Sequence, residues 1–169
     1  MTNSEALEQL ELVSGLYLRE VSQPGDHSLR LVVEEAVGHS ASESPAVTPQ
    51  QSHSGGRCFN LYWPSSVAYL VTDEPAGSSA RDGYSNESYT GQMLRLYSKS
   101  HFLEYIARDT GDHPATVLHY KLICANYRVD IAAYTPPEVC VLPPDARPRS
   151  SAHERPPSSR HIGGIIGPY

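Results

Sequence analysis

The sequence predicts an α+β fold: a mostly antiparallel sheet of about seven strands, arranged in hairpins, with one main helix packed on a face. Two observations lead to this prediction. Apolar and polar residues alternate with a period of two in most segments between Leu16 and Glu138, which is typical of strands. Only the segment from Ser98 to Gly111 has a convincing set of apolar residues at helical spacing.

The predicted strands follow one another as three hairpins and one further strand. Each hairpin is marked by alternating side chains on both sides of a short turn. The predicted pairs are Leu16–Val21 with Ser28–Val37, Cys58–Trp63 with Ser66–Glu74, and Ala115–Cys124 with Arg128–Tyr134, and the further strand is Gln92–Ser98. Pro136 and Pro137 are expected to end the last strand, because proline has no N–H to donate to a sheet.

The predicted helix follows the strand that ends at Ser98. Ser98 or Ser100 can cap its N-terminus by accepting hydrogen bonds from free backbone N–H groups. Gly111 and Pro114 are expected to end it. The apolar stripe that should face the sheet consists of Phe102, Leu103, Ile106 and Ala107. A shorter helical turn is predicted over residues 1–10.

The length of 169 residues fits one domain with its own core, which we place at residues 1–142. Residues 39–57 lack periodicity and are rich in Ser, Pro and Gln, so they are predicted to form a disordered surface loop. Residues 143–169 contain several Pro and Arg and few apolar residues before Ile162. They are predicted to form a disordered tail.

Charge narrows the classes of partner. The net charge is −6, and the four Arg of residues 143–169 make the body of the chain more acidic than the whole. An acidic body argues against binding to nucleic acid or anionic membranes and is compatible with a basic protein partner. The N-terminus lacks the features of a signal peptide, no apolar run is long enough to span a bilayer, and the three cysteines form no CxxC pair. These features predict a cytoplasmic protein with reduced thiols.

Tyrosine is the most distinctive residue type, with 11 Tyr against two Phe and one Trp. A tyrosine joins an apolar ring to a polar hydroxyl, which suits binding interfaces and also the rim of a core. The four tyrosines chosen as binding candidates are Tyr62, Tyr69, Tyr120 and Tyr127.

A small enzyme is the alternative hypothesis. His113, His119 and Asp130 could converge if the helix packs beside the last hairpin, and such a group can perform acid–base chemistry. The sequence contains no HExxH, GxSxG, Walker or GxGxxG motif, so no metal or cofactor is expected. The structural interpretation places His119 and Lys121 on the wetter face of the sheet, with Asp130 pairing Lys121 across the hairpin.

Three segments carry a resemblance: LYWPSSVAYLVTDE, LRLYSKSHFLEYIARDT and HYKLICANYRVDIAAYTPPEV. They resemble small uncharacterised bacterial α+β proteins, some of which accompany polymorphic toxins as immunity proteins. The resemblance covers roughly Leu16 to Glu138, and the loop at 39–57 and the tail are additions to that pattern. It implies a binding protein that inhibits a toxin domain, and it carries over no functional residues.

Overall fold

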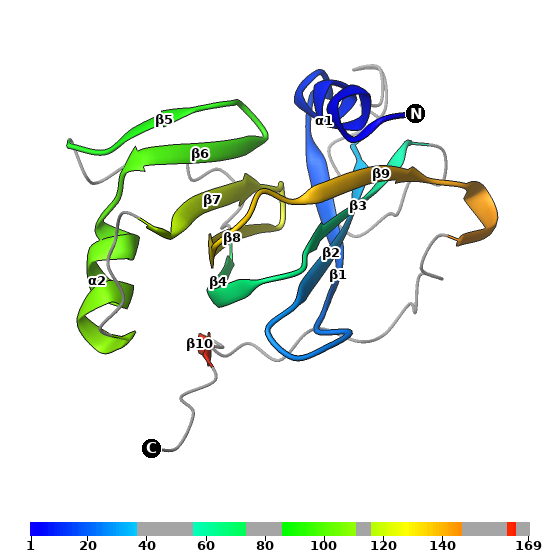
Figure 1. Ribbon diagram of the computed structural model, residues 1–169. Helices are drawn as coiled ribbons and strands as arrows, with labels where there is room; N and C mark the ends of the chain where they lie inside the picture. Colours follow the sequence, from blue (N-terminus) through cyan, green and yellow to red (C-terminus); the bar gives the residue numbers. More distant parts are fainter. Residues whose placement is uncertain (37–55, 74–85, 111–115, 147–161, 165–169) are drawn as a thin grey trace.

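Two antiparallel sheets and two helices make up the part of the chain that the computed structural model describes, residues 1–36, 56–73, 86–110, 116–146 and 162–164 (Figure 1). Sheet A has the strand order β1-β2-β3-β9, with bounds β1 Leu16–Ser22, β2 Leu29–Glu35, β3 Cys58–Trp63 and β9 Glu138–Leu142. Sheet B has the order β10-β4-β8-β7-β6-β5, with bounds β10 Ile162–Gly164, β4 Ser66–Asp73, β8 Tyr127–Ala133, β7 Leu118–Ile123, β6 Leu94–Lys99 and β5 Ser88–Thr90. The helices are α1 Asn3–Glu11, α2 His101–Thr110 and a short 3-10 turn at Pro144–Ala146.

The prediction of a mostly antiparallel α+β fold is confirmed, but the prediction of one seven-stranded sheet is wrong. The error lies at Pro64-Ser65, where a hairpin was expected. β3 pairs with β2 and β9, whereas β4 pairs with β8 and β10, so this turn carries the chain from one sheet to the other. The crossing is fixed by backbone hydrogen bonds from Ser66 N–H to the carbonyl of His27 and from Tyr134 N–H to the carbonyl of Ser65. Alternation alone cannot show which sheet a strand joins.

The first and last predicted hairpins are confirmed. β1 pairs with β2, and β7 pairs with β8 in a register that places Lys121 opposite Asp130. The strand predicted to end at Pro136-Pro137 is not the last one in the fold. The chain crosses back to sheet A, where β9 pairs with β3 from Cys58 opposite Leu142 to Tyr62 opposite Glu138.

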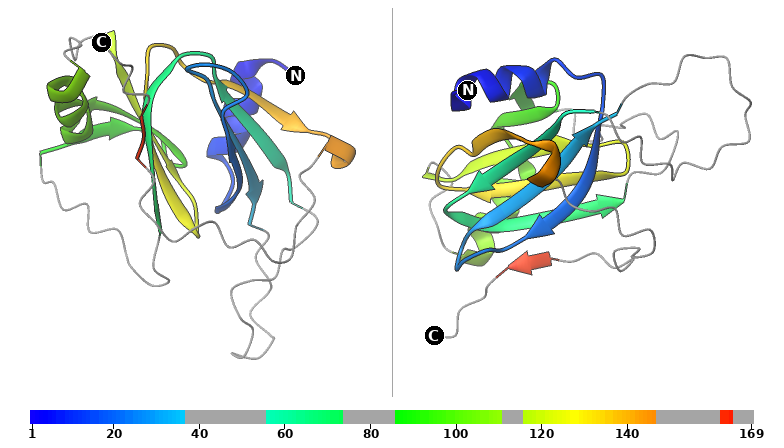
Figure 2. Two further views of the ribbon diagram at one scale, coloured as in Figure 1. Left: turned by 90° about the horizontal axis from the view of Figure 1, so that it is seen from below. Right: turned by 90° about the vertical axis from the view of Figure 1, so that its right-hand side faces the viewer.

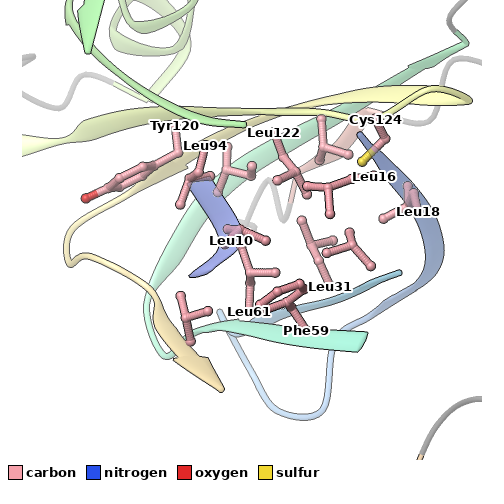
Figure 3. Close-up of a cluster of buried hydrophobic side chains, with 14 of the residues drawn as sticks. Leu10, Leu16, Leu18, Leu31, Phe59, Leu61, Leu94, Tyr120, Leu122 and Cys124 are labelled. Atoms are coloured by element: carbon pink, nitrogen blue, oxygen red, sulfur yellow. The ribbon is translucent and has the colours of Figure 1, made fainter. Parts of the chain in front are cut away.

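The main core fills the space between the two sheets (Figure 3). Sheet A contributes Leu16, Leu31, Phe59 and Leu61, which point towards Leu94, Tyr120 and Leu122 of sheet B. Each strand therefore presents alternate residues to one shared interior, which is the origin of the period of two. Burying a large apolar side chain of this kind stabilises the fold by about 1.5–3 kcal/mol.

Helix α1 corrects the expectation of a single main helix. It begins with a capping box, in which the Thr2 hydroxyl accepts a hydrogen bond from Glu5 N–H and the Glu5 carboxylate accepts one from Thr2 N–H. Its residues Ala6 and Leu10 are fully buried in the core, so α1 covers one end of the space between the sheets (Figure 1). The amphipathic pattern is short, which is why it predicted only a turn.

Helix α2 lies where the sequence predicts a helix, and it packs on the outer face of sheet B, away from sheet A (Figure 2). Ile106 makes a second, small core with Ala68 of β4, Ala132 of β8 and Val117, and Phe102 and Leu103 pack against it. The two alanines lie opposite each other in the register of the sheet. Because their side chains are small, the helix can approach the sheet closely at this point.

At each edge of sheet A, one asparagine side chain bonds to the backbone of the edge strand. At β1, the Asn126 side chain accepts from Leu18 N–H at 2.9 Å and donates to the Leu18 carbonyl at 3.0 Å. At β9, the Asn3 side chain accepts from Val139 N–H and donates to the Pro137 carbonyl at 3.3 Å. Each amide supplies one donor and one acceptor, as a neighbouring strand would, and this pairing blunts an edge that could otherwise bind another chain.

Candidate functional site

A chain of hydrogen bonds links α2 to the last hairpin through His119. The Ser100 hydroxyl lies 2.7 Å from His119 Nδ1, and His119 Nε2 lies 2.9 Å from Asp130 Oδ1. The same Asp130 oxygen lies 3.2 Å from Lys121 Nζ. Ser100 is the residue just before α2, and the other three side chains come from the outer face of the β7–β8 hairpin.

One tautomer satisfies every member of this chain. A neutral His119 with its proton on Nε2 donates to the Asp130 carboxylate and accepts from the Ser100 hydroxyl at Nδ1. The Ser100 oxygen in turn accepts from Leu103 N–H at 3.1 Å, which makes Ser100 the N-cap of α2. His119 is buried, and Ser100 is 5% exposed. Such complete pairing is what burial of polar groups requires.

Aromatic side chains enclose the imidazole. The Tyr97 ring is stacked on it with centroids 4.4 Å apart, and the Phe102 ring is tilted against it at 4.9 Å. The register of sheet B explains this arrangement. One row of outward-facing positions across the sheet holds Tyr89, Tyr97, His119, Ala132 and Ala68.

The next row of the sheet is charged. It places Arg95, Lys121 and Asp130 on neighbouring strands. Burial, the largest single influence, lowers the pKa of Lys121, but the Asp130 carboxylate and the Tyr97 hydroxyl together outweigh it, and the pKa of Lys121 is raised. Lys121 also lies 5.0 Å from the centre of the Tyr97 ring. The ammonium group therefore remains charged in this half-buried position.

The expectation that His119 lies on a wet face is wrong. Alternation places it correctly on the outer face, but α2, Tyr97 and Phe102 cover that face. The pairing of Asp130 with Lys121 is confirmed. His113, the third residue of the enzyme hypothesis, lies outside the described residues. Ser100 was predicted only as a helix cap, and its contact with His119 could not be read from residues that are far apart in the chain.

Ser, His and Asp are also the residue types of many hydrolases, so their accessibility matters. A nucleophilic serine needs its oxygen exposed to substrate. Here the Ser100 oxygen is buried. Its hydroxyl proton is directed to His119, and the oxygen accepts a hydrogen bond from Leu103 N–H. In this conformation the arrangement fastens the start of α2 to sheet B.

The four candidate tyrosines are divided between the sheets. Tyr120 is 6% exposed and lies in the main core, where its ring is 5.9 Å from that of Trp63. Burial raises the pKa of the Tyr120 hydroxyl. Tyr69 and Tyr127 are half-buried and pack against the same core. Tyr62 is half-buried in β3, one residue from the core residues Leu61 and Trp63 and so on the opposite, outer face of sheet A.

Exposed tyrosines lie elsewhere, on a surface that we call the α2–β5 surface and define by Tyr89, Arg95, His101 and Tyr105. Tyr89 is 40% exposed and Tyr105 is 56% exposed. The Arg95 guanidinium lies 4.3 Å from the centre of the Tyr89 ring. Glu87, the residue before β5, accepts a hydrogen bond through its carboxylate from the N–H of His101, the first residue of α2, at 2.9 Å. The start of α2 is therefore tied to the chain just before β5, the strand at the edge of sheet B.

The described residues form neither a metal site nor a membrane-spanning helix. Within the described ranges, no group of three or more His, Cys, Asp or Glu side chains is placed to hold a metal ion. Neither α1 nor α2 is long and apolar enough to cross a membrane, and no other described helix is either. No family model, curated protein or solved structure matches the chain.

Proposed function

We propose that this chain is a small binding protein that recognises a basic protein partner through the α2–β5 surface, as an immunity-type inhibitor of a toxin domain would. The observation that carries the proposal is the exposure of Tyr89, which lies beside Arg95, and of Tyr105 on α2. Tyrosine and arginine are over-represented among the residues that contribute most to protein–protein affinity. Here Tyr105 lies on α2, whose start the hydrogen bonds of the buried His119 fasten to sheet B, and Tyr89 and Arg95 lie on the paired strands β5 and β6.

Charge supports the choice of a basic partner. The whole chain carries −6. On α2, beside the exposed tyrosine, Glu104 pairs with His101 and has 52% of its side chain exposed. An overall negative potential accelerates encounter with a cationic protein, whereas the aromatic contacts slow dissociation. The rate of association should therefore fall as salt is added.

The proposal is tested with the protein encoded beside this chain's gene. The two are co-expressed, purified, and their dissociation constant is measured by calorimetry. Tyr89→Ala and Tyr105→Ala should each weaken binding by about 10-fold or more, in the range of a contact that contributes strongly to affinity. Tyr134→Ala is the matched control, because Tyr134 is 45% exposed but follows β8 rather than lying on this surface. Equal losses in all three variants, or no complex, would contradict the proposal.

A small hydrolase is the second candidate, and the contact of Ser100 with His119 is the observation that favours it. It requires α2 to move so that the Ser100 oxygen becomes accessible. A fluorophosphonate probe, which reacts with activated serines, tests this directly. Labelling that is lost in Ser100→Ala would support the hydrolase. Absence of labelling would mean that the hydrogen bonds of Ser100, His119 and Asp130 have a structural role only.

A further inference from the structure

The outer edge of β4 is covered by a very short strand from far along the chain. β10 pairs antiparallel with β4 through three residue pairs, Ile162 with Leu70, Gly163 with Tyr69 and Gly164 with Ala68 (Figure 2). On its other edge, β4 pairs with β8 from Ser66 to Asp73. Among the described strands none pairs with the outer edge of β4 beyond Leu70.

β10 is a poor strand by composition. Two of its three residues are glycine, which has no side chain to pack and loses the most backbone freedom when it is ordered. Its pairing therefore rests mainly on backbone hydrogen bonds. What favours the pairing is that β10 belongs to the same chain as β4, which raises its effective concentration at that edge.

Comparison of the sheet edges favours β4 of sheet B as the position where a further strand can be added. At the edges of sheet A, the side chains of Asn3 and Asn126 already occupy backbone groups of Val139 and Leu18. At the far edge of sheet B, β5 has only three residues. By contrast, β4 has eight residues. Its residue Tyr69 packs against the main core and its residue Ala68 belongs to the small core under α2, and these contacts hold the strand in place. It is the longest edge to which an extended peptide could be added.

We infer that the β4 edge is a peptide-binding site, and that β10 occupies it as a replaceable internal ligand. The external ligand is an extended segment of a partner protein that adds antiparallel to β4. It is a better strand former than Ile-Gly-Gly and places an apolar residue opposite Leu70, as β10 does. This site is separate from the α2–β5 surface and does not depend on it.

The test keeps the full chain and opens the edge with prolines. Backbone N–H groups along a strand point alternately to its two sides, so Ile162→Pro combined with Gly163→Pro removes at least one donor to β4. Ser158→Pro combined with Ser159→Pro is the control, since it adds the same residues outside β10. Hydrogen exchange of those Ala68–Leu70 amides whose N–H groups point to β10 should become at least 10-fold faster in the first variant only, while exchange in β7 stays unchanged.

The opened variant is then titrated with a synthetic peptide of residues 160–169 and with the same peptide carrying Val in place of both Gly163 and Gly164. Both should restore slow exchange at Ala68–Leu70, and the valine peptide should bind several-fold more tightly because valine favours strands. Unchanged exchange in the opened variant, or no protection by either peptide at millimolar concentration, would overturn the inference. So would a wild-type dimer in analytical ultracentrifugation that the proline pair dissociates, since β10 would then pair between copies.

Discussion

His119 and Asp130 are joined across the β7–β8 hairpin by a contact of 2.9 Å between Nε2 and Oδ1, with 1% and 13% of their side chains exposed. The two residues are not direct register partners, because His119 lies opposite Ala132 and Asp130 opposite Lys121. The contact is therefore a diagonal one, and it connects the aromatic row of sheet B to the charged row.

This contact predicts that His119 is needed for stability. His119→Ala should lower the free energy of unfolding by about 2–3 kcal/mol, because Ser100 and Asp130 each lose a buried partner. Urea unfolding followed by circular dichroism measures the change. His101→Ala is the matched control, since 40% of the His101 side chain is exposed and the expected change is within about 0.5 kcal/mol. Equal stability of both variants would contradict the structural role.

A second prediction concerns Glu11, the last residue of α1. Its carboxylate accepts hydrogen bonds from three consecutive backbone N–H groups, those of Gln92, Met93 and Leu94, and so fastens α1 to the start of β6. Glu11→Gln replaces a charged acceptor by a neutral amide and should cost about 1–2 kcal/mol in unfolding experiments. The exposed Glu8 of the same helix supplies the control Glu8→Gln.

The cysteines should differ sharply in reactivity. Cys58 and Cys124 are buried, and burial raises the pKa of the Cys124 thiol far above its usual range, whereas Cys140 is exposed. With Ellman's reagent at pH 8, one thiol per native chain should react rapidly and all three should react in guanidinium. Cys140→Ser should remove the rapid phase. A rapid phase that persists in this variant would show that Cys58 or Cys124 is accessible.

Acid should weaken the contact between β2 and Arg57. Hydrogen bonding to the Arg57 side chain is the main cause that lowers the pKa of the Glu35 carboxyl below 4.5. A lowered pKa in the folded state means that the ion pair stabilises the fold above about pH 4.5 and is lost as the pH falls through the folded value. The pair is partly exposed, so the expected contribution is below about 1 kcal/mol.

The measurement is the urea midpoint at pH 7 and at pH 3. The difference between the two should be smaller in Glu35→Gln than in the wild-type chain, and Glu8→Gln should leave it unchanged. An equal pH dependence in the Glu35 variant would show that the ion pair has no net effect on stability.

The sequence predicts the local elements well and their assembly poorly. The period of two identifies the strands because each one has a single buried face, and Ser100 marks the start of α2 because its hydroxyl caps the helix. The division into two sheets depends on which strands meet, and Pro64-Ser65 is compatible both with a hairpin and with a crossing.

The candidate site shows the same limit. Asp130 could be paired with Lys121 from the sequence because both lie in one hairpin whose register its turn determines. The burial of His119 could not be predicted from the sequence, because it is produced by a helix that folds over the sheet and brings Phe102 to the imidazole. Solvent exposure of a strand residue depends on what covers the sheet, and alternation contains no information on this.

The pairing of Cys58 with Leu142 has a consequence for the order of assembly during synthesis. β1, β2 and β3 emerge first and can pair at once, but the outer edge of β3 has no neighbour until β9 has been made. Strands β4 to β8 of sheet B lie between β3 and β9 in the chain, so they are made while that edge is open. Ribosome-bound intermediates should therefore be most prone to self-association before residue 142 emerges, and a chaperone that binds strand edges should act in that interval.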